Sequence, residues 1–200
     1  MSSLPQLILW YGREAAPDLP EMAGYRLRTY QPGDEEGWLA LLQANGELGR
    51  WDRQRLEDVL EETRVQLFVE CEEQIVACTG CNYRSPFHRS GRPLSPTGTR
   101  ELRPCWEIGW VAVHPDFQGR GLGKFIVGAA VAQAKELGPW PIYLHTDDFR
   151  IPALRCYLKL GFAPNNSHPS YPRRWADIFA RLGADYQALK PEFVPSDQSR

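Results

Sequence analysis

The segment from Gln118 to Lys124 is the part of this sequence best suited to bind a ligand. Its seven residues read Gln-Gly-Arg-Gly-Leu-Gly-Lys, so alternate residues lack a side chain and several backbone N–H groups can point into one concavity. The segment lies just before an apolar helical pattern, where unpaired amides and the positive end of the helix dipole favour an anion. Arg120 and Lys124 add positive charge. These residues predict a binding site for a diphosphate group.

Two common phosphate-binding motifs do not fit this segment. A Walker A loop requires Ser or Thr after its Gly-Lys pair, whereas Phe125 follows Lys124, and it requires glycine where this chain has Gln118. The dinucleotide-binding fingerprint fits Gly119 and Gly121 but requires a third glycine at position 124, which is lysine. The sequence therefore excludes both motifs.

A strand and a helix are predicted to position the loop. Residues 106–113 are rich in aromatic and β-branched side chains, which favour a strand, and Pro115 ends it. After the loop, apolar residues recur at spacings of three and four, and Gly138 and Pro139 end this pattern. The apolar positions are Leu122, Ile126, Ala129, Ala130, Ala134 and Leu137. The organising unit is thus a strand, loop and helix over residues 106–138.

This arrangement resembles the coenzyme A-binding motif of the GNAT family of N-acetyltransferases. The matching pattern is Gln-x-x-Gly-x-Gly at Gln118, Gly121 and Gly123, directly after the predicted strand. A second motif of the family, a helix that carries a tyrosine and ends in Leu-Gly-Phe, is matched over residues 147–163, where Tyr157 is the tyrosine. The resemblance covers roughly residues 25 to 163.

The resemblance implies an α/β fold. We expect a mixed central sheet of about six to seven strands with helices on both faces. The expected organisation is an N-terminal arm over residues 1–24, an acetyltransferase domain over 25–189 and a flexible tail over 190–200. A long segment over residues 84–103 is predicted to be a loop, either a substrate lid or a surface insertion.

Periodicity predicts the remaining elements of the domain. Alternating or continuous apolar runs indicate strands, and apolar residues at helical spacing indicate helices. The predicted strands cover 25–30, 65–71, 74–82 and 141–146, and the predicted helices cover 35–45, 50–63, 150–160 and 174–182. The strands over 65–71 and 74–82 are expected to form an antiparallel hairpin.

The resemblance also implies acetyl-CoA as co-substrate. Its pantetheine arm is expected to lie along the backbone of Val111, Ala112 and Val113. Its diphosphate is expected on the loop, formed by Gln118, Gly119, Arg120, Gly121, Leu122, Gly123 and Lys124. The family's second motif commonly begins with asparagine, but this chain has Arg150 there, whose guanidinium could reach a phosphate or an acceptor carboxylate instead.

The reaction implied by the resemblance is direct attack of a primary amine on the thioester. An amine is protonated near neutral pH, so a base is required, and the leaving thiolate benefits from an acid because a thiol pKa is about 8.5. Tyr157 is the candidate acid and Glu107 the candidate base. A core aromatic residue and a solvated glutamate are the structural alternatives for these two side chains.

Other polar residues have a structural interpretation that we favour. Asp147 and Asp148 could hold a cationic amine, but capping of the following helix by one of them is the preferred interpretation. His114 and His145 could relay protons, although histidines at strand ends are more often hydrogen-bonded structural residues.

Composition excludes several classes of function. A net charge of -2 and a pI near 6.1 argue against binding to nucleic acid or to an anionic membrane. The N-terminal sequence MSSLPQLILWYG has too short an apolar run for a signal peptide or a membrane span, so a cytoplasmic location is expected. The five cysteines are scattered, and Cys78 and Cys81 lack the partners of a zinc site, so reduced thiols and no metal are expected.

The sequence does not identify the acceptor. A small molecule or a peptide amine would both suit an acyltransferase of this kind, and a longer acyl donor is also open. A homodimer is possible. The alternative function is a non-catalytic acyl-CoA-binding sensor or interaction module, which would require neither Tyr157 nor Glu107.

Overall fold

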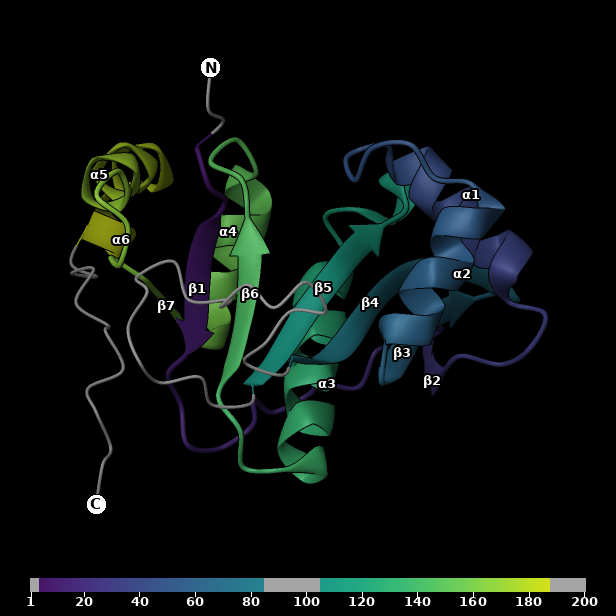
Figure 1. Ribbon diagram of the computed structural model, residues 1–200. Helices are drawn as coiled ribbons and strands as arrows, with labels where there is room; N and C mark the ends of the chain where they lie inside the picture. Colours follow the sequence, from purple (N-terminus) through teal and green to yellow (C-terminus); the bar gives the residue numbers. More distant parts are fainter. Residues whose placement is uncertain (1–3, 85–104, 188–200) are drawn as a thin grey trace. The chain divides into compact units, whose positions relative to one another are not determined.

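The computed structural model describes residues 4–84 and 105–187, and these contain seven strands and six α-helices (Figure 1). The chain divides into two compact units. The first includes residues 4–14 and 141–187, and the second consists of Ala15–Tyr83 and Trp106–Trp140.

The strands of the second unit follow the order β2-β3-β4-β5. They are β2 (Arg26–Thr29), β3 (Val65–Cys71), β4 (Gln74–Arg84) and β5 (Cys105–Val113). β3 is antiparallel to both β2 and β4. β5 also runs against β4, because His114 N–H donates to the carbonyl of Val76 whereas the Thr79 hydroxyl donates to the carbonyl of Gly109.

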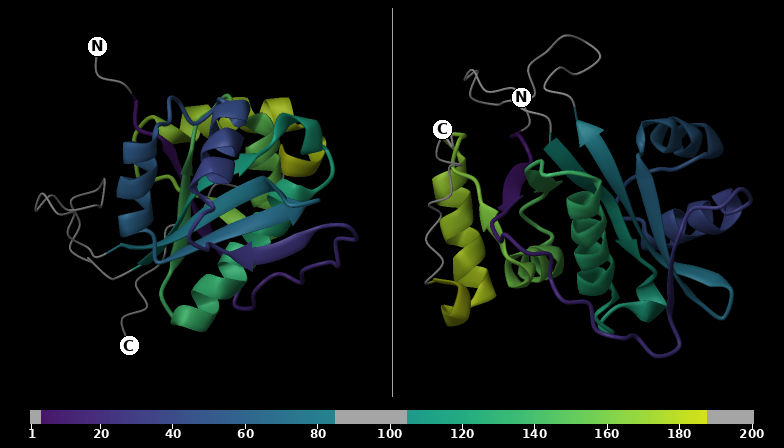
Figure 2. Two further views of the ribbon diagram at one scale, coloured as in Figure 1. Left: turned by 90° about the vertical axis from the view of Figure 1, so that its right-hand side faces the viewer. Right: turned by 90° about the horizontal axis from the view of Figure 1, so that it is seen from below.

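Helices cover both faces of these strands. They are α1 (Glu35–Asn45), α2 (Arg53–Glu62) and α3 (Leu122–Leu137). α1 and α2 lie on one face and α3 on the other (Figure 2). On the first face, Trp38 and Leu42 of α1 pack with Phe68 of β3, and all three side chains are fully buried. Burial of these large apolar side chains stabilises the unit that carries the glycine loop.

The β3–β4 hairpin has an unusual turn. Cys71 pairs with Gln74, so Glu72 and Glu73 form a two-residue connection. Both glutamates have positive φ, 49° and 67°, a conformation that hairpin turns usually assign to Asn and Gly. The antiparallel hairpin predicted from the sequence is confirmed.

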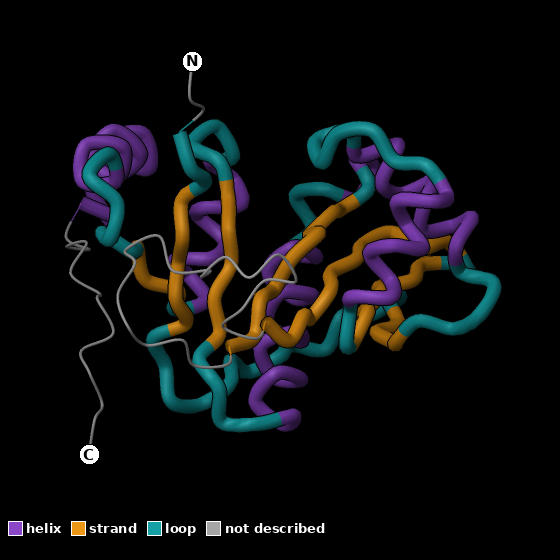
Figure 3. Tube along the Cα trace, viewed as in Figure 1, coloured by secondary structure: helices purple, strands orange, loops and turns teal. Residues whose placement is uncertain are grey.

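β1 is the middle strand of the first unit (Figure 3). It covers Leu7–Tyr11 and is antiparallel to β6 (Ile142–Thr146) and to β7 (Phe162–Pro164). The side chains of Leu7 and Leu9 are fully buried. Part of the predicted N-terminal arm is therefore a paired strand, and the domain boundaries expected at residues 24 and 190 stay predictions.

Three helices complete the first unit. They are α4 (Ile151–Leu160), α5 (Tyr171–Leu182) and the short α6 (Ala184–Gln187). α4 packs against β7 and against α5. α5 contributes Trp175, whose buried indole N–H donates to the carbonyl of Asn165 at 2.9 Å.

The predicted strands and helices are present, with ends shifted by no more than one helical turn. The loop predicted over 84–103 and the tail predicted over 190–200 lie outside the described residues. The one exception is Arg84, which is the last residue of β4. None of the helices in residues 4–84 and 105–187 combines the length and the hydropathy of a membrane span.

Candidate functional site

The glycine loop joins β5 to α3 through a short 3₁₀ helix, η1 (Pro115–Phe117). Gly119 and Gly121 have φ values of +76° and +85°, which favour glycine, and Gly121 is the N-cap of α3. A Cβ added at either glycine would meet no heavy atom within 4 Å. The glycines therefore provide both the backbone conformation and an open surface, which fits the approach of a diphosphate.

The backbone amides at the start of α3 are largely unused, although the Gln118 amide donates to the carbonyl of Pro115 at 3.2 Å. The N–H of Phe125 donates to the carbonyl of Gly121 at 3.0 Å, which is the first hydrogen bond of α3. Within the part of the chain that the structure describes, no acceptor receives the amides of residues 119–124. Unpaired amides at a helix N-terminus are a ready site for an anion.

Arg120 is held beside η1. Its guanidinium lies over the ring of Phe117 at 4.8 Å and donates to the carbonyl of Asp116 at 2.9 Å and to the hydroxyl of Tyr25 at 3.3 Å. Lys124 is exposed on the first turn of α3. Arg120 is thus partly engaged by protein groups, whereas Lys124 lies at the helix end where an anion would bind.

The end of β5 is fastened to the loop and to α1. The carbonyl of Val113 accepts from Gln118 Nε2 at 3.5 Å and from Asn45 Nδ2 at 3.0 Å. Ala112 and Leu122 are each 1% exposed, so they contribute backbone groups to the site and side chains to the core. The contact of Asn45 joins residues 68 apart, so no local sequence signal could have revealed it.

Trp110 interrupts β5 with a left-handed conformation. Its φ is +55°, uncommon for a bulky residue and costly unless the surroundings hold it. Its ring lies edge-on to Trp51 at 5.1 Å, and the Arg55 guanidinium lies over both rings at 4.3 and 5.6 Å. Such a residue bends a strand and turns its backbone groups away from the ladder, directly before Val111. The sequence analysis did not predict this feature.

The candidate base and the candidate acid lie in different units. Glu107 lies on β5 of the second unit and is half-buried. Tyr157 lies on α4 of the first unit, is 6% exposed and has its ring edge-on to Phe162 at 6.1 Å. Glu107 and the predicted coenzyme A contacts of β5 and the loop therefore belong to the second unit, while Tyr157 and Arg150 belong to the first.

Arg150 forms the N-terminal boundary of α4. Its Nε lies 3.2 Å from a carboxylate oxygen of Asp147, and its guanidinium lies 5.4 Å from the ring centre of Phe149. Arg150 is itself the N-cap residue, and no side chain caps the helix. The predicted capping of this helix by an aspartate is wrong.

The two aspartates are instead bound by other side chains. Asp148 accepts from Arg174 Nε at 2.8 and 3.1 Å, and Arg174 also donates to the carbonyl of Pro5 at 2.8 Å. The hydrogen bonds from Arg174 to Asp148 raise the pKa of Arg174. Asp147 accepts from Gln6 at 3.1 Å in addition to its ion pair with Arg150. Asp148 is therefore held by an arginine distant in sequence, and Asp147 by the distant Gln6 and the neighbouring Arg150, so neither carboxylate caps the helix.

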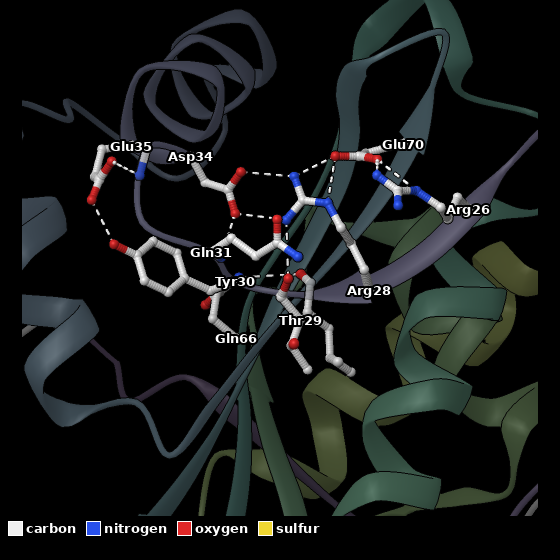
Figure 4. A network of polar contacts seen from close by, with 11 residues as sticks. Arg26, Arg28, Thr29, Tyr30, Gln31, Asp34, Glu35, Gln66 and Glu70 are labelled. Carbon is white, nitrogen blue, oxygen red and sulfur yellow. Dashed lines mark hydrogen bonds and ion pairs between the residues drawn. The ribbon is translucent and has the colours of Figure 1, made fainter.

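A second polar region of the second unit lies around Arg28 (Figure 4). Arg28 donates to both carboxylate oxygens of Asp34, at 2.6 and 2.7 Å, and also to Glu70. Arg26 donates to the other oxygen of Glu70 at 3.0 Å. A cavity of about 440 Å³ lies beside this network, and its lining includes His114.

The charges of this region are mutually satisfied. Hydrogen bonds from Arg28 lower the pKa of Glu70. Burial alone would raise the pKa of Asp34, but hydrogen bonds from Arg28 and from the amide of Gln31 outweigh it and lower that pKa. His114 is likewise occupied, because its Nδ1 accepts from the amide of Asp116 at 3.3 Å. These contacts support the structural interpretation of His114.

The cysteine pair is buried in the second unit. The thiol of Cys78 donates to the carbonyl of Trp110 at 3.4 Å, and that of Cys81 to the carbonyl of Ala130 at 3.7 Å. Burial raises the pKa of each thiol to about 12, which keeps both protonated. In residues 4–84 and 105–187, no three His, Cys, Asp or Glu side chains gather as a metal site would require.

Residues 26–162 match the family model described as the acetyltransferase (GNAT) family. The chain belongs to the GNAT acetyltransferase family. It is 27% identical over 162 residues to a mycothiol acetyltransferase of Actinosynnema mirum, and the match covers 78% of this chain and 51% of that protein. It is 31% identical over 156 residues to a mycothiol acetyltransferase of Thermobispora bispora, covering 74% and 48%. The chain thus spans about half the length of these curated relatives.

Solved structures of the family share the fold. A GNAT-family putative acetyltransferase of Novosphingobium aromaticivorans has a TM-score of 0.58 at 22% identity, covering 81% of this chain and 60% of that one. An acetyltransferase of Trypanosoma brucei has a TM-score of 0.53 at 22% identity, covering 71% and 94%. The predicted mixed sheet of about six to seven strands flanked by helices is confirmed, and the sheet has seven strands.

Proposed function

We propose that this chain transfers the acetyl group of acetyl-CoA to a primary amine. The observation that carries the proposal is the open glycine loop at the N-terminus of α3, where two left-handed glycines precede a row of amides that have no acceptor in residues 4–84 and 105–187. Family membership supports acyl transfer as the reaction.

The loop and the end of β5 would hold the co-substrate. The diphosphate would accept hydrogen bonds from amides of residues 119–124, and Lys124 would add its charge. The pantetheine arm would lie along Val111–Val113, after the turn in the backbone at Trp110. An amide of this segment would donate to the thioester carbonyl and stabilise the negative charge that develops on its oxygen.

Two side chains would manage the protons. Glu107 would take a proton from the substrate ammonium, and the neutral nitrogen would then form the new C–N bond as the C–S bond breaks. Tyr157 would give its hydroxyl proton to the leaving thiolate, and the second proton of the nitrogen would pass through solvent to restore Tyr157. The sum is an amide, coenzyme A and one released proton.

The acceptor would be a small molecule or a peptide amine. Because the curated relatives are named mycothiol acetyltransferases, the amine that acetylation would convert to mycothiol is the first acceptor to test. The proposal includes a cytoplasmic location, as expected from the sequence.

The test combines binding and turnover in two proteins. Wild type and a Tyr157→Phe, Glu107→Gln double variant are titrated calorimetrically with acetyl-CoA, and thiol release is followed with a panel of amines. We expect the variant to keep its affinity within about threefold and to lose roughly 1,000-fold in kcat, since general acid and base each contribute about 100-fold or more. Binding by the wild type without turnover would favour the sensor function, and absence of binding would overturn the proposal.

A further inference from the structure

The strand face beneath α1 and α2 changes from apolar to polar along its length. Phe68 of β3 and Cys78 of β4 belong to the buried apolar cluster on this face. Gln66 lies two residues before Phe68, and Gly80 and then Asn82 follow Cys78 at intervals of two. Residues two apart in a strand share a face, so Gln66, Gly80 and Asn82 continue the same surface.

Gln66 is a buried amide with one unused oxygen. It is 3% exposed and lies opposite Gly80 in the β3–β4 pair. A Cβ on Gly80 would lie 3.2 Å from Gln66 Oε1, so the carboxamide lies across this glycine. Its Nε2 donates to the carbonyl of Leu67 at 3.3 Å, but its Oε1 is buried without a hydrogen-bond partner in the described structure.

Asn82 repeats this arrangement one strand further on. It is 2% exposed, and a Cβ on Gly109 of β5 would lie 3.5 Å from its Nδ2. Its Oδ1 is also buried without a partner among the described residues. Two carboxamides on neighbouring strands thus lie over two glycines, and each has a buried oxygen that accepts no hydrogen bond from the part of the chain that the structure describes. A buried acceptor left in this state costs about 1–3 kcal/mol, so two such groups call for an explanation.

The candidate base lies on the same surface. Glu107 is two residues before Gly109, so it shares with Gly109 the face on which Asn82 lies. Trp110, which follows Gly109, packs with Trp51 on this side of β5 and adds an apolar surface. The two carboxamide oxygens that lack partners among the described residues thus lie on the face that also carries Glu107, and a group with several N–H donors would suit these two oxygens.

We propose that Asn82 and Gln66 form the subsite for the amino group of the acceptor. Their side-chain oxygens accept two N–H bonds of a primary ammonium, while Glu107 accepts the third and takes that proton. The inference rests on the proposed function and extends it, because it assigns the residues that bind the ammonium group of the acceptor. Asn82 and Gln66 are binding residues in this scheme, and neither exchanges a proton.

The test is an Asn82→Leu variant, which keeps the approximate shape and removes the oxygen. Wild type and variant are assayed for thiol release with ethanolamine, putrescine, glucosamine and alanyl-alanine, and the amine that the wild type uses best becomes the probe. We expect the KM for that amine to rise about 10- to 100-fold, from loss of a hydrogen bond to a charged donor, while the KM for acetyl-CoA is unchanged. The thermal midpoint of the unliganded variant should not fall, because a buried acceptor without a partner is removed.

Thr79→Val is the matched control. Thr79 is fully buried on the same strand, but its hydroxyl donates to the carbonyl of Gly109 at 3.0 Å. This variant should lower the thermal midpoint and leave both KM values unchanged, the reverse of Asn82→Leu.

The outcomes separate the inference from the function on which it rests. An active wild type whose amine KM is unchanged by Asn82→Leu would overturn the subsite and leave acetyl transfer standing. A fall in the thermal midpoint of Asn82→Leu comparable with that of Thr79→Val would also overturn it, with or without activity, because the oxygen would then have a structural partner. A wild type that releases no thiol with any amine would overturn the proposed function itself.

Discussion

The glycine loop and the Arg28 network are two polar regions of the second unit with opposite properties. In the network, Asp34 and Glu70 both receive hydrogen bonds from Arg28, and Arg26 adds a further one to Glu70. In the loop, the amides of residues 119–124 have no acceptor among the described residues, and they lead into and form the first turn of α3. In the first region the charged groups have partners within the fold, whereas the second keeps amide donors to which the proposed diphosphate could bind.

The presence or absence of hydrogen-bond partners distinguishes these two regions better than their charge does. The network has more charged side chains and a neighbouring cavity, yet its lowered carboxyl pKa values show that its arginines already stabilise the ionised forms. The loop has fewer charges but offers amide donors that no described residue accepts. Shifted pKa values alone would select the Arg28 network, although ion pairs built for stability also shift pKa values.

The largest expected effect comes from placing a carboxylate in the loop. Gly121→Glu adds a side chain at a φ of +85° and a negative charge where the diphosphate would lie. We expect acetyl-CoA affinity to fall by about 1,000-fold or more in calorimetric titration, equivalent to about 4 kcal/mol. Gly24→Glu is the control, because Gly24 has a φ of +81°, equally open surroundings and the same change in charge. Equal losses in both variants would contradict the role of the loop.

The next effect should appear in stability and not in binding. Arg28→Met leaves Asp34 and Glu70 without their shared partner, and both Arg28 and Asp34 have side chains only 12% exposed. We expect the free energy of unfolding in urea to fall by about 2–3 kcal/mol, with acetyl-CoA affinity unchanged. Arg53→Met breaks an exposed pair with Glu57 and should have no measurable effect on either quantity. A large loss of affinity in Arg28→Met would remove the distinction between the two regions.

The network should also control the response to acid. The pKa values of Asp34 and Glu70 are lowered in the folded state, so their contribution to stability is complete above their unfolded pKa values near 4. That contribution is lost as the pH falls through the lower folded values. Thermal midpoints measured between about pH 7 and pH 3 should therefore decline less steeply in Asp34→Asn than in the wild type. Parallel curves would show that the pair does not carry the acid sensitivity.

The smallest effect is expected for the charged residue inside the loop. Arg120 is already engaged with Phe117, Asp116 and Tyr25 and is exposed to solvent. Arg120→Gln should weaken acetyl-CoA binding only about two- to fivefold, and less at high salt, since exposed charge pairs contribute little. A loss as large as that of Gly121→Glu would show that the side chain, and not the backbone, binds the anion.

The features that could be predicted from the sequence are those determined by residues close to one another along the chain. Gly119 and Gly121 are required by the conformation of their own backbone, and Tyr157 lies one helical turn before Gly161, which ends the same helix. A pattern read along the chain is enough to locate such residues. The strand, loop and helix around the predicted diphosphate site were therefore predictable.

The residues that escaped prediction depend on distant partners. Trp110 adopts a left-handed conformation within a segment whose composition indicates a regular strand. Asn82 looks like any polar strand residue in the sequence, and only the structure shows that its side-chain oxygen is buried without a partner among the described residues. The predicted helix cap failed for the same reason, because Arg174 on a later helix binds Asp148. Register, bulges and ion pairs across long separations cannot be read from local patterns.

The two buried thiols of β4 give the second unit an internal reporter of its own opening. Cys78 and Cys81 are fully buried and protonated, so a thiol-specific reagent can modify them only after this unit has opened. Their labelling rate, measured by mass spectrometry of peptides, would thus follow the opening equilibrium of the layer between α1 and α3. If acetyl-CoA binds the loop that begins α3, it should slow this labelling by the factor expected from its affinity, without any substitution in the protein.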